Sequence, residues 1–120
     1  MRIEVLDETF SICKVEDFSE VVLAEFCFTA KTDEECSLVC TQDAVPENAI
    51  ECEDGWRAFR IEGPLDFSLT GILAKLSAVL ADASIGIFAI STFDTDSILV
   101  KEDDFEDAQG ALAAAGYELI

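Results

Sequence analysis

The chain has 120 residues, enough for one ordinary domain or for two units of about 60 residues that support each other. Its formal net charge of −19 repels phosphate backbones, and its seven Lys and Arg residues are scattered, which excludes nucleic acid as an expected partner. No apolar run approaches the roughly 20 residues that cross a bilayer, and the N-terminus lacks the regions of a signal peptide. We therefore expect a cytoplasmic protein without a membrane partner, whose acidity serves solubility or the recognition of a basic partner.

The chain holds five cysteines and no histidine. Without histidine, nucleophile–base pairs of the Ser-His and Cys-His kinds are excluded, and no carboxylate spacing indicates a dry acid–base site. A zinc site would need Cys36 and Cys40 joined to a distant cysteine, so buried free thiols that pack as small apolar groups are the simpler expectation. We expect no enzyme activity, no metal and no cofactor.

Residues 1–55 have the pattern of a helix-poor unit that ends at the polar turn Glu53-Asp54-Gly55. Thr32 to Glu35 fits a helix-capping pattern for one or two turns, and Val21–Glu25 is a second short helical segment. We interpret this half as a degenerate version of the second half. Its expected strands are Arg2–Leu6, Phe10–Val15, Phe26–Ala30, Cys36–Thr41 and Ala49–Cys52.

Residues 56–120 form a second unit with clearer periodicity. A strand covers Trp56–Glu62, and Gly63-Pro64 ends it. Apolar residues then recur at helical spacing from Ile72 to Ala83, and the Ser68 hydroxyl is placed to cap the first turn.

The rest of this unit continues with a hairpin, a helix and a strand. Ile85–Phe93 and Ser97–Val100 are β-rich runs separated by a short polar turn. Asp103 and Glu106 fit a capping pattern that opens a helix, and Gly116 terminates it before a last short strand. The order β-α-β-β-α-β predicts an α+β, ferredoxin-like fold packed on the shorter N-terminal unit.

The strands of the predicted hairpin are continuously apolar at Ile87–Ile90 and Ile98–Val100. Two helices of a single ferredoxin-like unit cover only one face of its sheet, so the second face or edge needs another cover. We expect the N-terminal half, a second subunit in a homodimer, or both to supply it.

The runs SLTGILAKL at 68–76 and LADASIGI at 80–87 resemble the signature of the ACT domain family. Ser68, Thr70 and Ser84 depart from the aspartate-like, proline and junction-glycine positions of that signature. Together with GPLDFSLTGILAKL, the run FAISTFDTDSILVKEDD is similar to small bacterial proteins with two ACT-like units and to the ACT units of the CASTOR-type arginine sensors.

The resemblance implies a regulatory protein that binds a free amino acid in a crevice between ACT units. A helix N-terminus offers unpaired amides and a positive dipole end to a carboxylate, and Gly71 allows a close approach to the backbone. In the sensors a carboxylate shortly after the strand end holds a cationic side chain, and Asp96 falls at the matching place. We expect Asp96 or Asp94 to select or anchor a positively charged group. The expected ligand-binding residues are Asp66, Ser68, Leu69, Thr70, Gly71, Ile72, Thr92, Phe93, Asp94 and Asp96.

Structural roles stand beside these functional ones. Asp94 and Asp96 are ordinary turn formers, Asp66 fits a loop or cap, and Phe93 fits a core or an interface. The alternative function is a protein-interaction module of the same fold whose ligand site is vestigial.

Overall fold

The computed structural model describes residues 1–63 and 71–120, which form two compact units. The C-terminal unit comprises residues 1–7 and 57–120, and the N-terminal unit comprises residues 8–56. Strands β1 (Arg2–Val15) and β4 (Ala49–Ile61) each contribute one end to each unit. Residues 1–7 therefore do not belong with the N-terminal half as predicted, because Ile3 is fully buried in the same hydrophobic cluster as Phe59.

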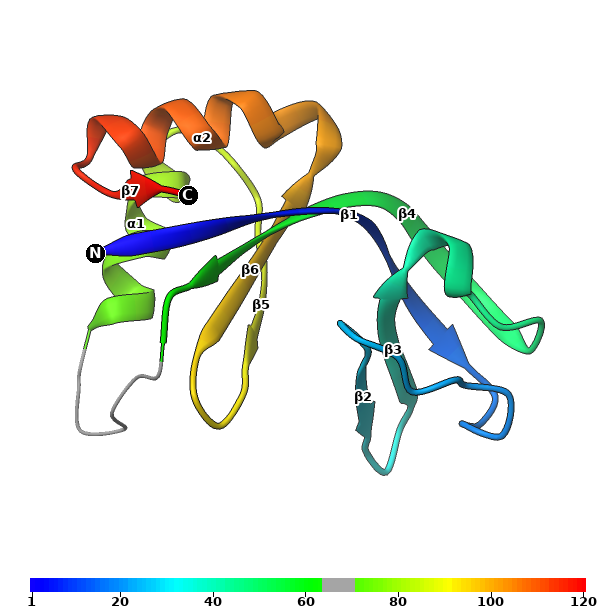
Figure 1. Cartoon of the computed structure of the whole chain (residues 1–120). Coiled ribbons are helices and arrows are strands. Elements are labelled where there is room, and N and C mark those ends of the chain that lie inside the picture. Colours follow the sequence, from blue (N-terminus) through cyan, green and yellow to red (C-terminus); the bar gives the residue numbers. More distant parts are fainter. Residues whose placement is uncertain (64–70) are drawn as a thin grey trace. The chain divides into compact units, whose positions relative to one another are not determined.

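The C-terminal unit has the chain order that the sequence predicts (Figure 1). After β4 come α1 (Ile72–Asp82), β5 (Phe88–Ser91), β6 (Asp96–Lys101), the 3-10 turn η2 (Glu102–Asp104), α2 (Phe105–Ala114) and β7 (Glu118–Leu119). In its sheet β7 pairs in parallel with β1, and the order continues through β4 and β6 to β5, which pairs antiparallel with β6. The predicted hairpin and the predicted last strand are confirmed.

Helices α1 and α2 share one hydrophobic core with the sheet of the C-terminal unit. Phe59 and Ile61 alternate along β4 on the face that meets the helices, as residues two apart on a strand must. Ala58 and Leu99, whose side chains point to the opposite face, are each only 1% exposed. On β5, Phe88 and Ile90 are half-buried and Ala89 is exposed, so the predicted cover of both faces is found at β4 and β6 but not at β5. The residues of this core that are at most 1% exposed are Ile3, Phe59, Ile61, Leu76, Leu80, Ile98, Val100, Ala108 and Leu112. Ile85, which is 6% exposed, belongs to the same cluster.

Helix α1 begins later than predicted and ends where predicted. Gly71, in a left-handed conformation with φ of 77°, precedes the first helical residue, and the Lys75 amide donates to its carbonyl at 2.8 Å. Gly71 holds the N-cap position, and the predicted capping residue Ser68 lies outside the described residues.

Helix α2 also begins differently from the prediction. Glu102–Asp104 form a 3-10 turn, and no side chain caps the helix, so the predicted capping role of Asp103 is wrong. Gly116, with φ of 97°, comes after the helix as the predicted terminator.

The N-terminal unit has the strand order β2 (Phe28–Lys31), β3 (Cys36–Thr41), β1 and β4. The 3-10 turn η1 (Gln42–Ala44) comes after β3, and the predicted helix at Val21–Glu25 is absent, since that segment is irregular. β1 is continuous rather than two strands. β4 also continues through the predicted turn, because Gly55 adopts φ of 78° within the strand and donates its amide to Gln42 Oε1 at 3.0 Å.

The hairpins of the two units repeat each other at an offset of 60 residues (28 to 88, 36 to 96). Phe28 opposes Val39 in the first hairpin, and Phe88 opposes Leu99 in the second, with the same register along both pairs of strands. A 3-10 turn comes after each hairpin at the same offset.

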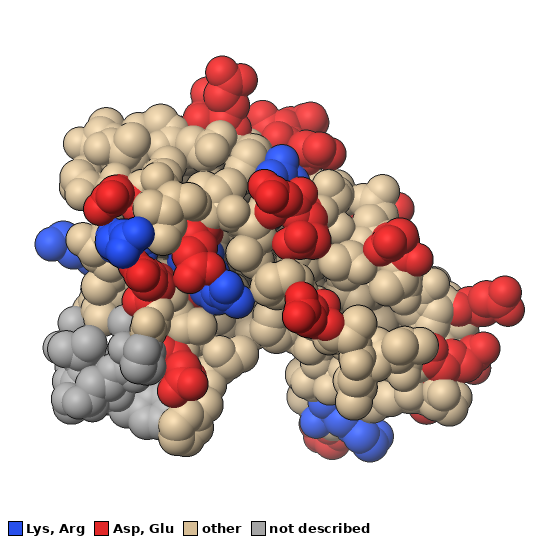
Figure 2. Space-filling model, viewed as in Figure 1, with Lys and Arg blue, Asp and Glu red and all other residues tan. Residues whose placement is uncertain are grey.

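The acidity predicted for the surface is visible in Figure 2, where Asp and Glu side chains are spread over the face shown rather than gathered in one patch. Among the described helices, neither the length nor the apolarity needed to cross a membrane is found.

Candidate functional site

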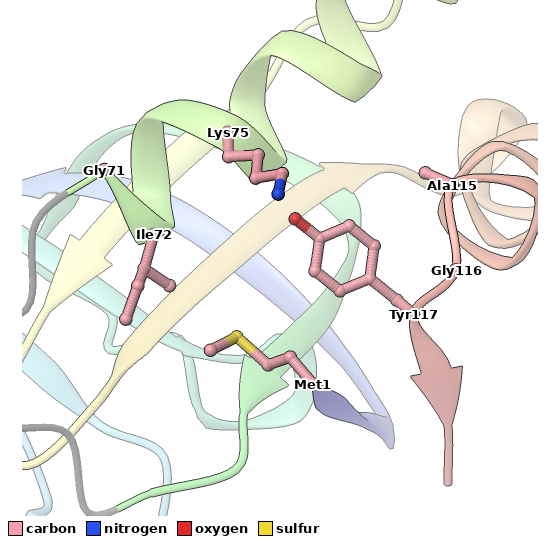
Figure 3. A pocket seen from close by; sticks show the side chains of 7 residues that line it. All are labelled: Met1, Gly71, Ile72, Lys75, Ala115, Gly116 and Tyr117. Carbon is pink, nitrogen blue, oxygen red and sulfur yellow. The ribbon is translucent and has the colours of Figure 1, made fainter.

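A pocket of about 380 Å³ opens beside the first turn of α1 in the C-terminal unit (Figure 3). This volume lies at the small end of the range for small-molecule sites. Residues from the chain start, the start of α1 and the end of α2 line it: Met1, Gly71, Ile72, Lys75, Ala115, Gly116 and Tyr117.

The start of α1 supplies one wall of this pocket. The first hydrogen bond within the helix joins the Lys75 amide to the Gly71 carbonyl, so the amides of Ile72, Leu73 and Ala74 have no carbonyl of α1 to bind. These amides form the positive end of the helix dipole, which favours an anion.

The end of α2 and the chain start supply the other wall. Gly116 turns the chain out of α2, and the Tyr117 amide then donates to the Leu112 carbonyl at 3.1 Å. The next amide, that of Glu118, donates to the Met1 carbonyl at 3.1 Å, which holds the chain start beside β7. Three segments that are distant in sequence thus meet at one pocket.

Two polar side chains face each other across the pocket. In Figure 3 the Lys75 ammonium and the Tyr117 hydroxyl point toward one another from α1 and from the segment after α2. Lys75 forms no ion pair with any residue in the ranges 1–63 and 71–120. Among the described residues that line it there is no carboxylate, so this part of the lining suits an anionic oxygen group beside an apolar one.

The structure brings only part of the predicted site together. Gly71 and Ile72 line the pocket. Four other predicted residues lie outside the described ranges: Asp66, Ser68, Leu69 and Thr70. The last four do not line this pocket: Thr92, Phe93, Asp94 and Asp96.

Thr92, Phe93 and Asp94 belong to the bend between β5 and β6, and Asp96 is the first residue of β6. The Thr92 amide and hydroxyl both donate to the Thr95 carbonyl, at 2.9 and 3.1 Å, and the Thr95 hydroxyl donates to the Ile61 carbonyl. Phe93 is 79% exposed, and Asp96 opposes Ser91 at the first step of the hairpin. The bend is therefore ordered by its threonines.

Sequence reasoning missed Lys75, Tyr117 and Met1. Lys75 lies four residues after Gly71, so helical spacing places it on the same side of α1, and that signal was present in the sequence. For Met1 and Tyr117 no local signal existed, because they reach the pocket through the pairing of β1 with β7.

The described residues contain no group of three Cys, Asp or Glu side chains arranged to hold a metal ion. Cys36 and Cys40 contribute instead to the hydrophobic cluster of the N-terminal unit, together with Cys13, Val15 and Leu38.

A family model described as "ACT domain" matches residues 51–114, more than half of the 120 residues. The chain belongs to the ACT domain family. The match includes α1, α2 and the hairpin between them, and it covers the runs at 63–76, 80–87 and 88–104 that carried the resemblance in the sequence.

Curated ACT relatives match a shorter part of the chain. The "Cytosolic arginine sensor for mTORC1 subunit 1" of Bos taurus and of Homo sapiens is 49% identical over 49 residues, which is 40% of this chain. The matched part is only 15% of the length of those sensors.

Solved structures match almost the whole chain. Protein Atu0741 of Agrobacterium tumefaciens is 32% identical with a TM-score of 0.88, over 99% of this chain and 91% of that one. The ligand-free regulatory subunit of aspartate kinase from Thermus thermophilus is 12% identical with a TM-score of 0.67, over 97% of each chain. The second likeness concerns the fold alone, and the mixed α/β fold of this ACT protein is thus similar to that of a regulatory subunit.

Proposed function

We propose that this ACT protein is a non-catalytic regulatory protein that binds a free amino acid at the start of α1. The observation that carries the proposal is the pocket itself, which joins the first-turn amides of α1, the Lys75 ammonium and the Tyr117 hydroxyl. The described part of its lining offers no nucleophile–base pair and no carboxylate for acid–base work. Such a set of groups can bind an anion without reacting with it.

An α-carboxylate fits the polar end of this pocket. It would accept hydrogen bonds from the first-turn amides of α1 and from Lys75, while Tyr117 donates its hydroxyl. The ligand's side chain would contact the apolar part of the lining, formed by Met1, Ile72 and Ala115. We retain the sequence-based proposal that Asp94 or Asp96 anchors a cationic group of the ligand, as a separate contact with a separate test.

The proposal includes a finer view of the fold, in which two ACT-like units, the C-terminal one ferredoxin-like, occur in one chain. The 60-residue repeat of the hairpins, with the same register in each, supports a common origin of the two units. We further propose a homodimer, to be checked by mass measurement in size-exclusion chromatography with and without ligand. The mammalian relative is named as a cytosolic sensor, and we propose the cytoplasm for this chain.

Thermal unfolding in the presence of each of the twenty amino acids tests the proposed function. A ligand at a hundred times its dissociation constant should add about 2.7 kcal/mol to the free energy of unfolding. If no amino acid raises the melting temperature, the rival function applies, in which the protein is an interaction module with a vestigial site.

Calorimetry on variants then tests the location. Lys75→Gln should weaken binding of the amino acid found by about 10- to 100-fold, the range for losing a hydrogen bond to a charged group. Tyr117→Phe should weaken it less, and Lys14→Gln, an exposed lysine of the N-terminal unit, serves as the matched control.

The same titration separates the two contacts. Lys75→Gln with unchanged affinity would refute the α1 pocket as the site. Asp96→Ala with unchanged affinity would refute only the proposed anchor for a cationic group.

A further inference from the structure

Two cysteines of the N-terminal unit lie against each other on neighbouring strands. Cys13 is on β1 and Cys52 is on β4, and their Sγ atoms are 2.7 Å apart. Because β1 and β4 are adjacent in the sheet, the two thiols approach through the backbone pairing and not through a flexible loop.

The neighbouring side chains agree with this cross-strand position. Two residues earlier on β1 and two residues later on β4, the Ser11 hydroxyl donates to Asp54 Oδ1 at 2.5 Å. Residues two apart on a strand share a face, so these are successive cross-strand neighbours on one face of the sheet. The sulfur atoms therefore meet without any change of strand register.

The two thiols differ in accessibility. Cys13 is 3% exposed, whereas Cys52 is exposed to solvent. Burial, followed by the hydrogen bond with Cys52, raises the pKa of Cys13 well above its ordinary value. A dissolved reagent therefore meets Cys52 first, and Cys13 is placed to react second.

Cys40 is the nearest competitor. It lies on β3 opposite Ser11, in the same hydrophobic cluster as Cys13. It is 4% exposed, and burial raises its pKa as burial raises that of Cys13, so neither buried thiol is the one that a dissolved reagent attacks first. The accessible thiol beside Cys13 is that of Cys52.

We propose that Cys13 and Cys52 are a modification site at which a low-molecular-weight disulfide oxidises the pair to a reversible cross-strand disulfide. The Cys52 thiolate attacks one sulfur of the small disulfide, breaking its S–S bond and releasing one small thiolate. Cys13 then loses its proton to solvent and attacks Cys52 Sγ, forming the protein disulfide and expelling the second small thiolate. Two protein thiols are oxidised by two electrons, the reagent is reduced to two thiols, and excess small thiol reverses the exchange.

This disulfide would join β1 to β4 inside the N-terminal unit, apart from the residues that line the α1 pocket. The proposal does not depend on amino-acid binding.

Mass spectrometry of the intact protein after incubation with oxidised glutathione tests the proposal. The wild-type mass should fall by that of two hydrogen atoms, and alkylation under denaturing conditions should then modify three of the five cysteines. Trypsin should release residues 3–14 linked to residues 32–57, and fragmentation should locate the second end of the link at Cys52 rather than Cys36 or Cys40. Reduction should restore the original mass.

Cysteine variants test whether the disulfide joins Cys13 to Cys52 or forms between other cysteines. Cys13→Ser should stop at the mixed disulfide and retain a glutathionyl group on Cys52, because the resolving thiol is gone. Cys52→Ser, at an exposed position, should acquire neither a glutathionyl group at residue 52 nor the intramolecular link, and Cys36→Ser is the control that should still lose two hydrogen atoms. The proposal is overturned if wild type keeps all five thiols, if the link joins other cysteines, or if Cys52→Ser still loses two hydrogen atoms.

Discussion

Gly71 and Gly110 have equal space around them but different backbones. A Cβ added to either glycine meets no atom within 4 Å, yet Gly71 has φ of 77° and Gly110 lies inside α2. Gly71→Ala should therefore destabilise the protein by about 1 kcal/mol, because an L-side chain is strained at positive φ. Gly110→Ala should stabilise it by roughly 0.5–1 kcal/mol, since alanine is the better helix former.

Chemical denaturation of both variants measures these changes in the free energy of unfolding. The two glycines serve as controls for each other, since the same atoms are added in both. If Gly71→Ala did not lower the free energy of unfolding, strain at the left-handed conformation of Gly71 would be contradicted, and a loss of stability in Gly110→Ala would contradict the helix-propensity argument.

The hydrogen bonds of the Thr32 side chain are of a kind that occurs both at the start of a helix and in a turn between strands. The sequence predicts a helix start there, and the Thr32 hydroxyl does accept the amides of Glu34 and Glu35, both at 3.1 Å, as a capping residue would. The segment is nevertheless the turn between β2 and β3, closed by the Thr32 amide donating to the Glu35 carbonyl at 2.9 Å. The prediction of a helix was wrong because the pairing of β2 with β3 makes the residues after the turn a strand.

Thr32→Ala should cost about 1 kcal/mol of stability, because the turn loses the acceptor for two amides. Thr32→Ser keeps the hydroxyl and should restore most of that loss. Equilibrium unfolding of the three proteins measures both steps, and equal stability of the Ala and Ser variants would show that the hydroxyl does not stabilise the turn.

Among the elements, the sequence predicts secondary structure best where the apolar residues follow a single helical or strand spacing. Leu76 and Leu80 recur at helical spacing and are both fully buried in the core of the C-terminal unit, as expected for the inner face of α1. The prediction of a turn at Glu53-Asp54-Gly55 was wrong, because a polar segment that ends in glycine is typical of a turn, whereas here it lies within β4. A turn and an irregular position within a strand both accept glycine at positive φ, so only the pairing of β4 with its neighbours shows which of the two Gly55 occupies.

At the scale of the whole molecule, the net charge of −19 opposes compaction. Salt should therefore raise the melting temperature, since the screening length falls from about 30 Å at 0.01 M to about 10 Å at 0.1 M. A gain of about 1 kcal/mol corresponds to roughly 4–8 °C for a small domain.

Calorimetric scans across this range of sodium chloride measure the effect. Choline chloride at equal ionic strength is the control, because it screens charge without offering a small metal cation. A melting temperature that does not change with either salt would contradict self-repulsion, and a rise with sodium chloride alone would indicate a bound ion instead.

The sequence by itself determined the acidic character, the absence of histidine chemistry, the order of elements from β4 to β7 and the resemblance that the ACT match confirms. These come from composition and from patterns within single elements. Only the tertiary structure decided that β1 pairs with both β3 and β7, which brings Met1 and Tyr117 to Gly71 and Lys75. The tertiary structure likewise decided that the sulfur atoms of Cys13 and Cys52 lie side by side. The pairing of strands that are distant in the chain depends on all the strands that compete for each edge, so neither strand's own sequence indicates its partner.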